Sequence, residues 1–290
     1  MKKSLGEKTF SVFNTVFLTL LACATLYPFI YVLAASLSSP EYINMGRVWL
    51  WPRGFTTDAF VKVFERNGLW TAYLNSFFYM FVGTAVNVLF TICGAYPLSR
   101  QRLVGRRALN LAVTFTMWFS AGMIPTYLNF KAFGMLNTRW GIIFGFACSS
   151  YEFILLRTYF SSIPDEMEEA SKIDGANDFL TMMGIYVPLA LPSLATIALF
   201  YAVTRWNSYL WPMILLNDDK KIPLQVLLKK LLADMSGRME SVAYGVDSSN
   251  TSEDSVMYAT MIFSIVPMLV LYPFVQRFFI KGVMLGGVKG

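Results

Sequence analysis

The chain has 290 residues, of which 56% are hydrophobic and 16% are aromatic, and its formal net charge is +6. It contains no histidine, which removes the commonest general base, the commonest metal ligand and the physiological pH switch. The basic residues flank apolar stretches, so anionic lipid and membrane topology explain the positive charge better than nucleic acid does.

The charged residues fall in clusters that are separated by long gaps. Five gaps exceed the roughly 20 residues that a helix needs to cross about 30 Å of hydrocarbon. A sixth apolar stretch, from Trp140 to Phe160, is interrupted by Glu152 and Arg157. We therefore predict an all-α integral membrane protein with about six transmembrane helices. The expected spans are 11–37, 73–98, 108–130, 140–160, 188–211 and 257–279. Cys23, Cys93 and Cys148 all fall within them, too scattered for a metal site or a disulfide framework.

The short basic segments predict the orientation of these spans. Lys2, Lys3 and Lys8 precede the first span, and four arginines crowd the loop Arg100–Arg107 after the second. Such segments stay in the cytoplasm under the positive-inside rule, so both termini are expected to be cytoplasmic. The chain shows no internal repeat and no separate soluble segment, which predicts one transmembrane domain over 1–290.

The expected outer segments are 38–72, 131–139 and 212–256. The last contains PLQVLLKKLLADM, whose apolar residues recur at helical spacing from Leu224 to Met235. One interpretation is a helix that lies on the lipid headgroups. The other is a docking surface for an external partner.

The expected cytoplasmic segment 161–187 is too long for a simple turn. Ser162 and Asp165 have the spacing of a capping pair, and Pro164 suits a first helical turn. Gly175 is expected to end this helix, because glycine takes the left-handed conformation of a helix C-cap. Asn177 or Asp178 then caps a second helix. The segment is therefore predicted to be a helix-turn-helix between two spans.

The same segment resembles a known family motif. Glu169-Ala170-Ser171, then three residues to Gly175, then nine to Ile185-Tyr186-Val187-Pro188, is similar to the EAA loop of ABC importer permeases. Ser171 replaces the usual third alanine and Val187 the usual leucine, while the spacing is kept. In that family the loop is the coupling helix that sits in a cleft of the ATPase. The residues that the resemblance implies for coupling are Glu169, Ala170, Ser171, Asp174, Gly175 and Ala176.

Two further stretches, Met123–Gly141 and Trp206–Leu215, resemble carbohydrate-uptake permeases of the maltose-transporter type, closest to the branch for larger or acidic oligosaccharides. The resemblance implies the type I permease fold, alternating access and a multi-pass subunit of the bacterial cytoplasmic membrane. It implies a homologous second permease as a heterodimer partner, two copies of an ABC ATPase and an extracytoplasmic solute-binding protein. The chain has no G-x-x-x-x-G-K-[ST] sequence, so it is expected to be no enzyme and to bind no cofactor, with ATP and magnesium held by the ATPase.

Polar and aromatic residues within the spans are candidates for the substrate pathway. Glu152 follows Ser149, Ser150 and Tyr151, and an ionised carboxylate at that depth must be paired or wetted. It either accepts sugar hydroxyls or forms a hydrogen bond to a neighbouring helix or to the companion permease. Arg205 is expected to reach the outer interface or an acidic substrate. Gly141 and Gly145 form a G-x-x-x-G pattern that we interpret as helix packing. The pathway candidates are Tyr151, Glu152, Trp118, Asn129, Trp206, Asn207 and Tyr209.

Two other classes of protein compete with this interpretation. An ion-coupled secondary transporter is expected to show inverted repeats and buried carboxylate networks. A membrane-embedded enzyme needs a nucleophile with its base, or a metal cluster, and the sequence suggests neither.

Overall fold

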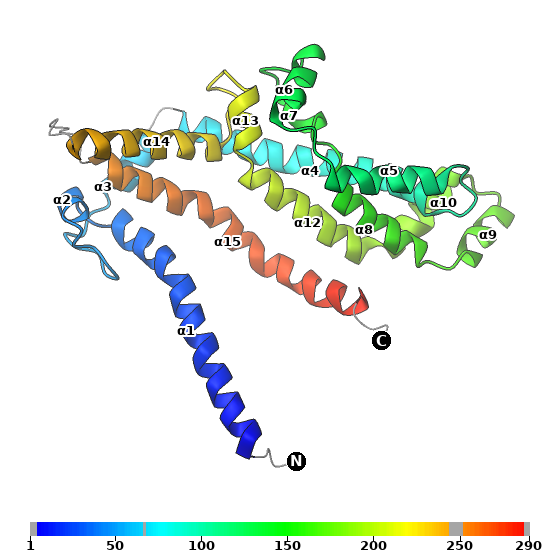
Figure 1. Ribbon diagram of the computed structural model, residues 1–290, viewed down its shortest axis with the longest axis horizontal. Helices are drawn as coiled ribbons and strands as arrows, with labels where there is room; N and C mark the ends of the chain where they lie inside the picture. Colours follow the sequence, from blue (N-terminus) through cyan, green and yellow to red (C-terminus); the bar gives the residue numbers. More distant parts are fainter. Residues whose placement is uncertain (1–4, 66–67, 244–251, 287–290) are drawn as a thin grey trace. The chain divides into compact units, whose positions relative to one another are not determined.

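The computed structural model describes residues 5–65, 68–243 and 252–286, which form helices joined by loops (Figure 1). The chain divides into two units, Met1–Leu69 with Leu228–Val266, and Trp70–Leu227 with Pro267–Gly290. The α-helices are α1 Leu5–Ser36, α2 Pro40–Asn44, α3 Asp58–Glu65, α4 Leu69–Ser99, α5 Arg106–Trp118, α6 Met123–Ala132, α7 Arg139–Phe144, α8 Ser150–Ser161, α9 Glu166–Ile173, α10 Asp178–Thr181, α11 Val187–Leu189, α12 Leu191–Asn207, α13 Leu210–Leu215, α14 Leu224–Ala243 and α15 Ser252–Gly286. A π-helix, Met182–Tyr186, joins α10 to α11.

The all-helical prediction is confirmed, whereas the number of spans is supported only in part. Within the described residues, Gly6–Ser36 and Leu69–Ser99 are each long and apolar enough to cross a membrane. Two bent pairs qualify only if each pair counts as one span: α5 with α6, bent by 118°, and the segment 178–189 with α12, bent by 84°. By length and hydropathy the described chain thus holds two to four candidate spans.

The predicted spans 108–130 and 140–160 are each interrupted. Between α5 and α6, Gly122 has φ +88°, a conformation that side-chain-bearing residues rarely adopt. Between α7 and α8, Gly145 follows the last turn of α7, and the extended backbone of Ser149 precedes α8. A Cβ at Gly145 would lie 2.1 Å from the Phe130 ring, so the G-x-x-x-G pattern does serve close packing.

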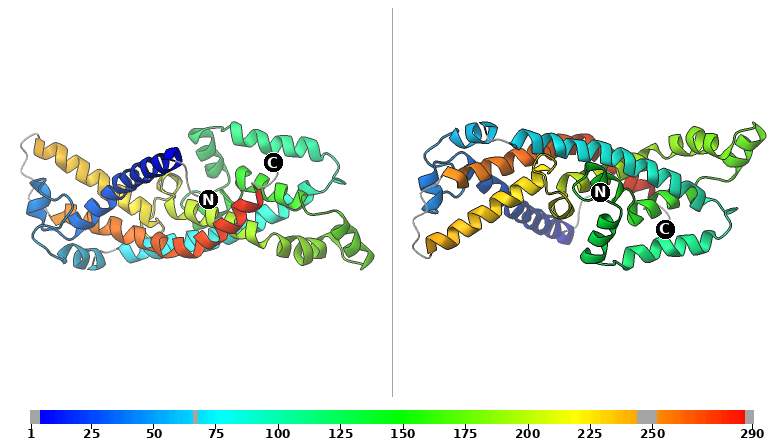
Figure 2. Two further views of the ribbon diagram at one scale, coloured as in Figure 1. Left: turned by 90° about the horizontal axis from the view of Figure 1, so that it is seen from below. Right: turned by 90° about the horizontal axis from the view of Figure 1, so that it is seen from above.

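The second unit holds two buried apolar clusters. The first joins α4, α8, the π-helix and α12 through residues such as Tyr96, Phe160 and Ile197. Helices α8 and α12 lie side by side (Figures 1 and 2). The other cluster includes Phe130, Ile143 and Val226. Val226 lies in the first turn of α14, so the start of the amphipathic helix packs against protein. Met235 and the polar run up to Thr251 belong to the expected outer segment, but their side chains lie outside the described residues.

The first unit is built around the end of α1. Ala34 and Ala35 pack against Ile43 and Val48, and the ring of Tyr31 meets that of Tyr258 edge-on, 5.9 Å between centroids. Upstream, the apolar side chains of α1 are exposed over its candidate span. Such a surface suits contact with lipid tails or with another apolar helix.

The expectation for Arg205 is wrong. Its side chain is only 8% exposed and lies within the second unit. The guanidinium donates to Asn87 Oδ1 and to the carbonyl oxygens of Ile142, Ile143 and Phe146 at 2.6–3.0 Å. These carbonyls lie at and just beyond the C-terminal end of α7, where the helix dipole favours a cation. Arg205 therefore holds the broken α7–α8 segment onto α12, and its guanidinium is bonded within the subunit instead of reaching outward.

Candidate functional site

The segment between α8 and the π-helix forms the predicted helix-turn-helix. Helix α9 ends in a Schellman motif, in which the amide of Ala176 donates to Ser171 O at 2.9 Å and that of Gly175 to Lys172 O at 3.0 Å. Gly175 has φ +80°, the left-handed conformation expected of it. The turn is thus fixed by its own backbone hydrogen bonds.

Asn177 caps the second helix, as predicted. Its side-chain oxygen accepts from the amide of Leu180 at 2.9 Å. The capping role expected of Ser162 is wrong, because its hydroxyl donates to Tyr159 O and closes α8 instead. Helix α9 begins at Glu166, and Asp165 precedes it without a side-chain cap.

Helix α9 has two different faces. Glu169, Ala170 and Asp174 are exposed, and Ile173 is 87% exposed. Ser171 is one of the residues expected for coupling to the ATPase, but it is buried, together with Glu168, on the opposite face of α9. Its hydroxyl bonds Thr181 Oγ1 at 2.8 Å, which links α9 to α10.

The buried face of α9 meets the C-terminal end of α4. Arg100 follows the last residue of α4, and its side chain is 3% exposed. Its Nη1 lies 3.3 Å from both Asp165 Oδ1 and Glu168 Oε2 and also donates to the Tyr186 hydroxyl. Its Nη2 donates to Phe160 O at 2.6 Å.

Glu168 is the acidic centre of this network. Its Oε1 lies 3.1 Å from Arg102 Nε and 2.6 Å from Lys172 Nζ. Burial by itself raises the pKa of the Glu168 carboxyl, but Lys172, Arg102 and Arg100 outweigh burial and hold the pKa below its ordinary value. Because the pKa is lowered on folding, the stabilisation is present at neutral pH and is lost only as the pH falls through that lowered pKa.

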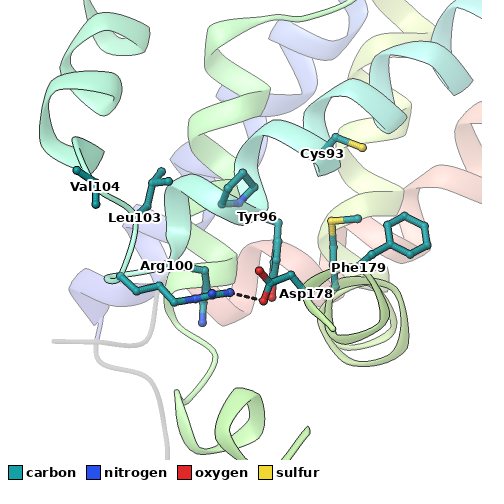
Figure 3. A pocket seen from close by; sticks show the side chains of 10 residues that line it. Cys93, Tyr96, Arg100, Leu103, Val104, Asp178 and Phe179 are labelled. Atoms are coloured by element: carbon teal, nitrogen blue, oxygen red, sulfur yellow. Dashed lines mark hydrogen bonds and ion pairs between the residues drawn. The ribbon is translucent and has the colours of Figure 1, made fainter. Parts of the chain in front are cut away.

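Arg102 extends the network to α10 on the exposed side. It pairs with Glu168 and with Asp178, and the latter pair is the dashed line in Figure 3. Beside it lies a cavity of about 520 Å³, lined by Tyr96, Leu103 and Phe179 among others. The carboxylates of Asp165, Glu168 and Asp178 are thus already paired with arginines of the chain. Within the described ranges, no group of three or more His, Cys, Asp or Glu side chains is placed to hold a metal ion.

The pathway candidates differ in how deeply they are buried. Glu152 is 8% exposed in the first turn of α8 and accepts a hydrogen bond from the Ser149 hydroxyl. Trp206 is 1% exposed, and its ring meets those of Tyr73 and Phe77. The remaining candidates have exposed side chains: Tyr151, Trp118, Asn129, Asn207 and Tyr209.

Sequence reasoning missed Arg100, Glu168 and Tyr186 as parts of the site. In the sequence Arg100 indicates only topology, and Glu168 is one of four acids between Asp165 and Glu169. A basic residue at the end of a span and an acid on a short helix are common surface features. Only the packing of α4 against α8 and the π-helix makes them partners.

The sequence matches the family described as "Binding-protein-dependent transport system inner membrane component" over residues 64–285. It is 40% identical over 274 residues to the polygalacturonan/rhamnogalacturonan transport system permease protein of Bacillus subtilis, covering 94% of this chain and 96% of that protein. It is 27% identical to an arabinooligosaccharide transport system permease protein of Halalkalibacterium halodurans, covering 95% of each chain. A chain in the crystal structure of a bacterial ABC transporter for import of the acidic polysaccharide alginate superposes with a TM-score of 0.87 at 41% identity, covering 96% of this chain and 99% of that one.

Proposed function

Because the chain belongs to the family of binding-protein-dependent transport system inner-membrane components, we propose that it carries an acidic oligosaccharide into the cell and that α9 and α10 couple it to a separate ATPase. Its relatives are permease subunits of ABC importers for sugars and oligosaccharides, so the chain is a membrane permease and no enzyme. ATP is hydrolysed on another subunit, and the ion-coupled alternative has no support. An ATPase and a solute-binding protein are the partners of this family.

The substrate class rests on two full-length similarities. The relatives at 40% and 41% identity belong to transport systems for polygalacturonan or rhamnogalacturonan and for alginate, and the alginate system is described as importing an acidic polysaccharide. The arabinooligosaccharide permease is more distant, at 27%. An acidic oligosaccharide is therefore favoured over a neutral one.

The coupling surface that we propose is the exposed face of α9 with the turn that follows it. Glu169 and Asp174 offer charges to partner cations, and Ala170, Gly175 and Ala176 offer a small-residue surface that can seat in a cleft. Ser171 contributes from the buried side, by holding α9 to α10.

We retain the six spans and the single transmembrane domain as part of this proposal. Both termini, the Arg100–Arg107 loop and the segment 161–187 are cytoplasmic, and the segment 212–256 lies outside. A homologous second permease completes a heterodimer above two ATPase copies. The exposed pathway candidates, such as Tyr151 and Trp118, then face the sugar path or the second permease.

Transport assays should separate acidic from neutral substrates. We expect the complete importer, reconstituted in vesicles, to take up oligogalacturonides or alginate oligosaccharides in an ATP-dependent manner, and to take up raffinose at least about tenfold more slowly, since buried polar groups left without their substrate partners discriminate strongly. The measurement is initial uptake of each sugar with its binding protein. Equal uptake of raffinose would contradict the acidic class, and uptake independent of ATP would contradict the importer.

Cysteine labelling should establish the orientation. In a variant with Cys23, Cys93 and Cys148 replaced by serine, we expect a membrane-impermeant maleimide to modify Arg53→Cys in intact cells. Val104→Cys and Ile173→Cys, which replace side chains 93% and 87% exposed, should react only after permeabilisation. The reason is that the short basic segment around Val104 resists translocation. Labelling of Val104→Cys or Ile173→Cys from outside would show that the topology is the reverse of the one proposed, and it would contradict the coupling proposal.

A further inference from the structure

We propose that Arg100 is a positioning residue that transmits the displacement of α9 and α10 to the transmembrane helix α4. This inference rests on the proposed function, because it assumes that α9 is the element on which the ATPase acts. It adds the route by which that motion reaches α4, a helix that does not adjoin α9 along the chain.

The chain itself connects α9 to only some of the spans. Helix α8 leads directly into α9, and α10 continues through the π-helix and α11 into α12. Helix α4 ends at Ser99, far upstream in the sequence. Any movement that α4 shares with α9 must therefore pass through non-covalent contacts.

Arg100 concentrates those contacts in one buried group. Its guanidinium bonds Glu168 of α9, the carbonyl oxygen of Phe160 in α8 and the hydroxyl of Tyr186 in the π-helix. Its Nε donates to the Ser99 hydroxyl at 2.9 Å, so the side chain is also anchored to the helix from which it comes. Four helical elements thus meet at one planar cation.

The chemistry of this position requires arginine. A guanidinium offers five N–H donors in a fixed fork, whereas a lysine ammonium offers three from a single point. The guanidinium carbon also lies 4.4 Å from the centre of the Tyr186 ring, within cation–π distance. A lysine keeps the charge but cannot reach Glu168, Phe160 and Tyr186 together.

Burial distinguishes Arg100 from Arg102, which contacts the same carboxylate. The Arg100 side chain is 3% exposed and that of Arg102 is 48% exposed. Water and salt screen the exposed ion pair and leave the buried one nearly unscreened. A rigid link between α9 and α4 is therefore carried by Arg100, with a smaller contribution from Arg102.

The test uses the complete importer with its companion permease, ATPase and binding protein in vesicles. The variants are Arg100→Lys, Glu168→Gln and the two combined, with Arg107→Lys as the control, since Arg107 is an exposed arginine in the first turn of α5, seven residues further along the chain. The readouts are the amount of ATPase that copurifies, ATP hydrolysis stimulated by the loaded binding protein, and sugar uptake. The quantity that decides is the number of sugars imported per ATP hydrolysed.

We expect Arg100→Lys to assemble and hydrolyse ATP, but to import about tenfold fewer sugars per ATP, the scale of one or two lost hydrogen bonds to a charged group. Glu168→Gln should act in the same direction, and the double variant should be no worse than Arg100→Lys, because both changes break one link. Arg107→Lys should match the wild type.

A wild-type number of sugars per ATP in Arg100→Lys, or a proportional fall of assembly, hydrolysis and uptake, would overturn the inference. If Arg100→Lys fails to assemble, Glu168→Gln decides in the same way, since the carboxamide keeps the shape of the side chain. Normal coupling in these variants together with uncoupling by Gly175→Val refutes this route alone. Normal coupling in all of them refutes the proposed coupling element itself.

Discussion

Replacing Gly175 with valine is expected to leave the subunit in the membrane while uncoupling ATP hydrolysis from sugar uptake. Gly175 has φ +80° and stands at the C′ position of the Schellman motif that ends α9. A β-branched residue held in this conformation carries strain of about 1–3 kcal/mol. The turn relieves that strain by opening, which changes the angle between α9 and α10. We expect uptake to fall at least about fivefold, on the scale of that strain, while the amount of subunit in the membrane is unchanged.

Matched variants separate backbone strain from added volume. A Cβ at Gly175 and a Cβ at Gly184 both meet nothing within 4 Å, but only Gly175 has a positive φ. Gly175→Ala should therefore impair coupling, whereas Gly184→Ala should not. Gly175→Asn should keep more of the coupling than Gly175→Ala does, because asparagine tolerates the left-handed conformation better than other side-chain-bearing residues do. The measurements are sugar uptake and sugar-stimulated ATP hydrolysis in vesicles.

Glu169→Lys serves as the companion variant, because it reverses a charge on the exposed face of α9 without altering the turn. It should weaken copurification of the ATPase more than it changes the ratio of sugar to ATP. Wild-type uptake and hydrolysis with both Gly175→Val and Glu169→Lys would contradict the proposal that α9 and α10 couple the subunit to the ATPase.

Replacing Arg205 with methionine should strongly reduce the amount of folded subunit. The change removes the donors to Asn87 Oδ1 and to the backbone carbonyls of Ile142 and Ile143. The carbonyl of Phe146 loses its bond from Arg205 but keeps the one from Asn87 Nδ2. A buried acceptor left without a donor costs about 1–3 kcal/mol, and more where lipid excludes water. The expected destabilisation is therefore more than about 3 kcal/mol, a large part of the 5–15 kcal/mol typical of a folded protein.

A second substitution, Gly83→Ala in α4, tests the same hydrogen bonds around Arg205. A Cβ at Gly83 would lie 2.9 Å from Arg205 Nε, and the five hydrogen bonds leave this side chain little freedom to move away. Gly83→Ala should therefore lower the thermal unfolding temperature in detergent, and Gly184→Ala should not. Arg205→Lys should be intermediate, since an ammonium satisfies some of these carbonyls. A wild-type unfolding temperature for Arg205→Met would show that the cluster adds no stability.

The sequence by itself determined the class of the protein and the local form of its coupling segment. The charge-free gaps require a membrane, because each is long enough for a helix to cross the hydrocarbon. The turn at Gly175 and the cap at Asn177 were predictable because both depend on residues within a few positions along the chain. The spacing from Glu169 to Pro188 likewise carried the family resemblance.

The tertiary structure alone decided which charges are buried together and where the spans break. Arg100 and Glu168 are 68 residues apart, and Arg205 and Asn87 are 118 apart, so no local pattern announces either pair. From the sequence, Arg100 indicated only topology and Arg205 was expected to reach outward. The sequence shows that burying each charge costs free energy, but it does not show which partner offsets that cost. Apolar gaps likewise measure total hydrophobicity, and they do not detect the single glycine at which a predicted span turns by 118°. Packing between distant helices resolves both questions, because it alone determines which donors and acceptors meet out of contact with water.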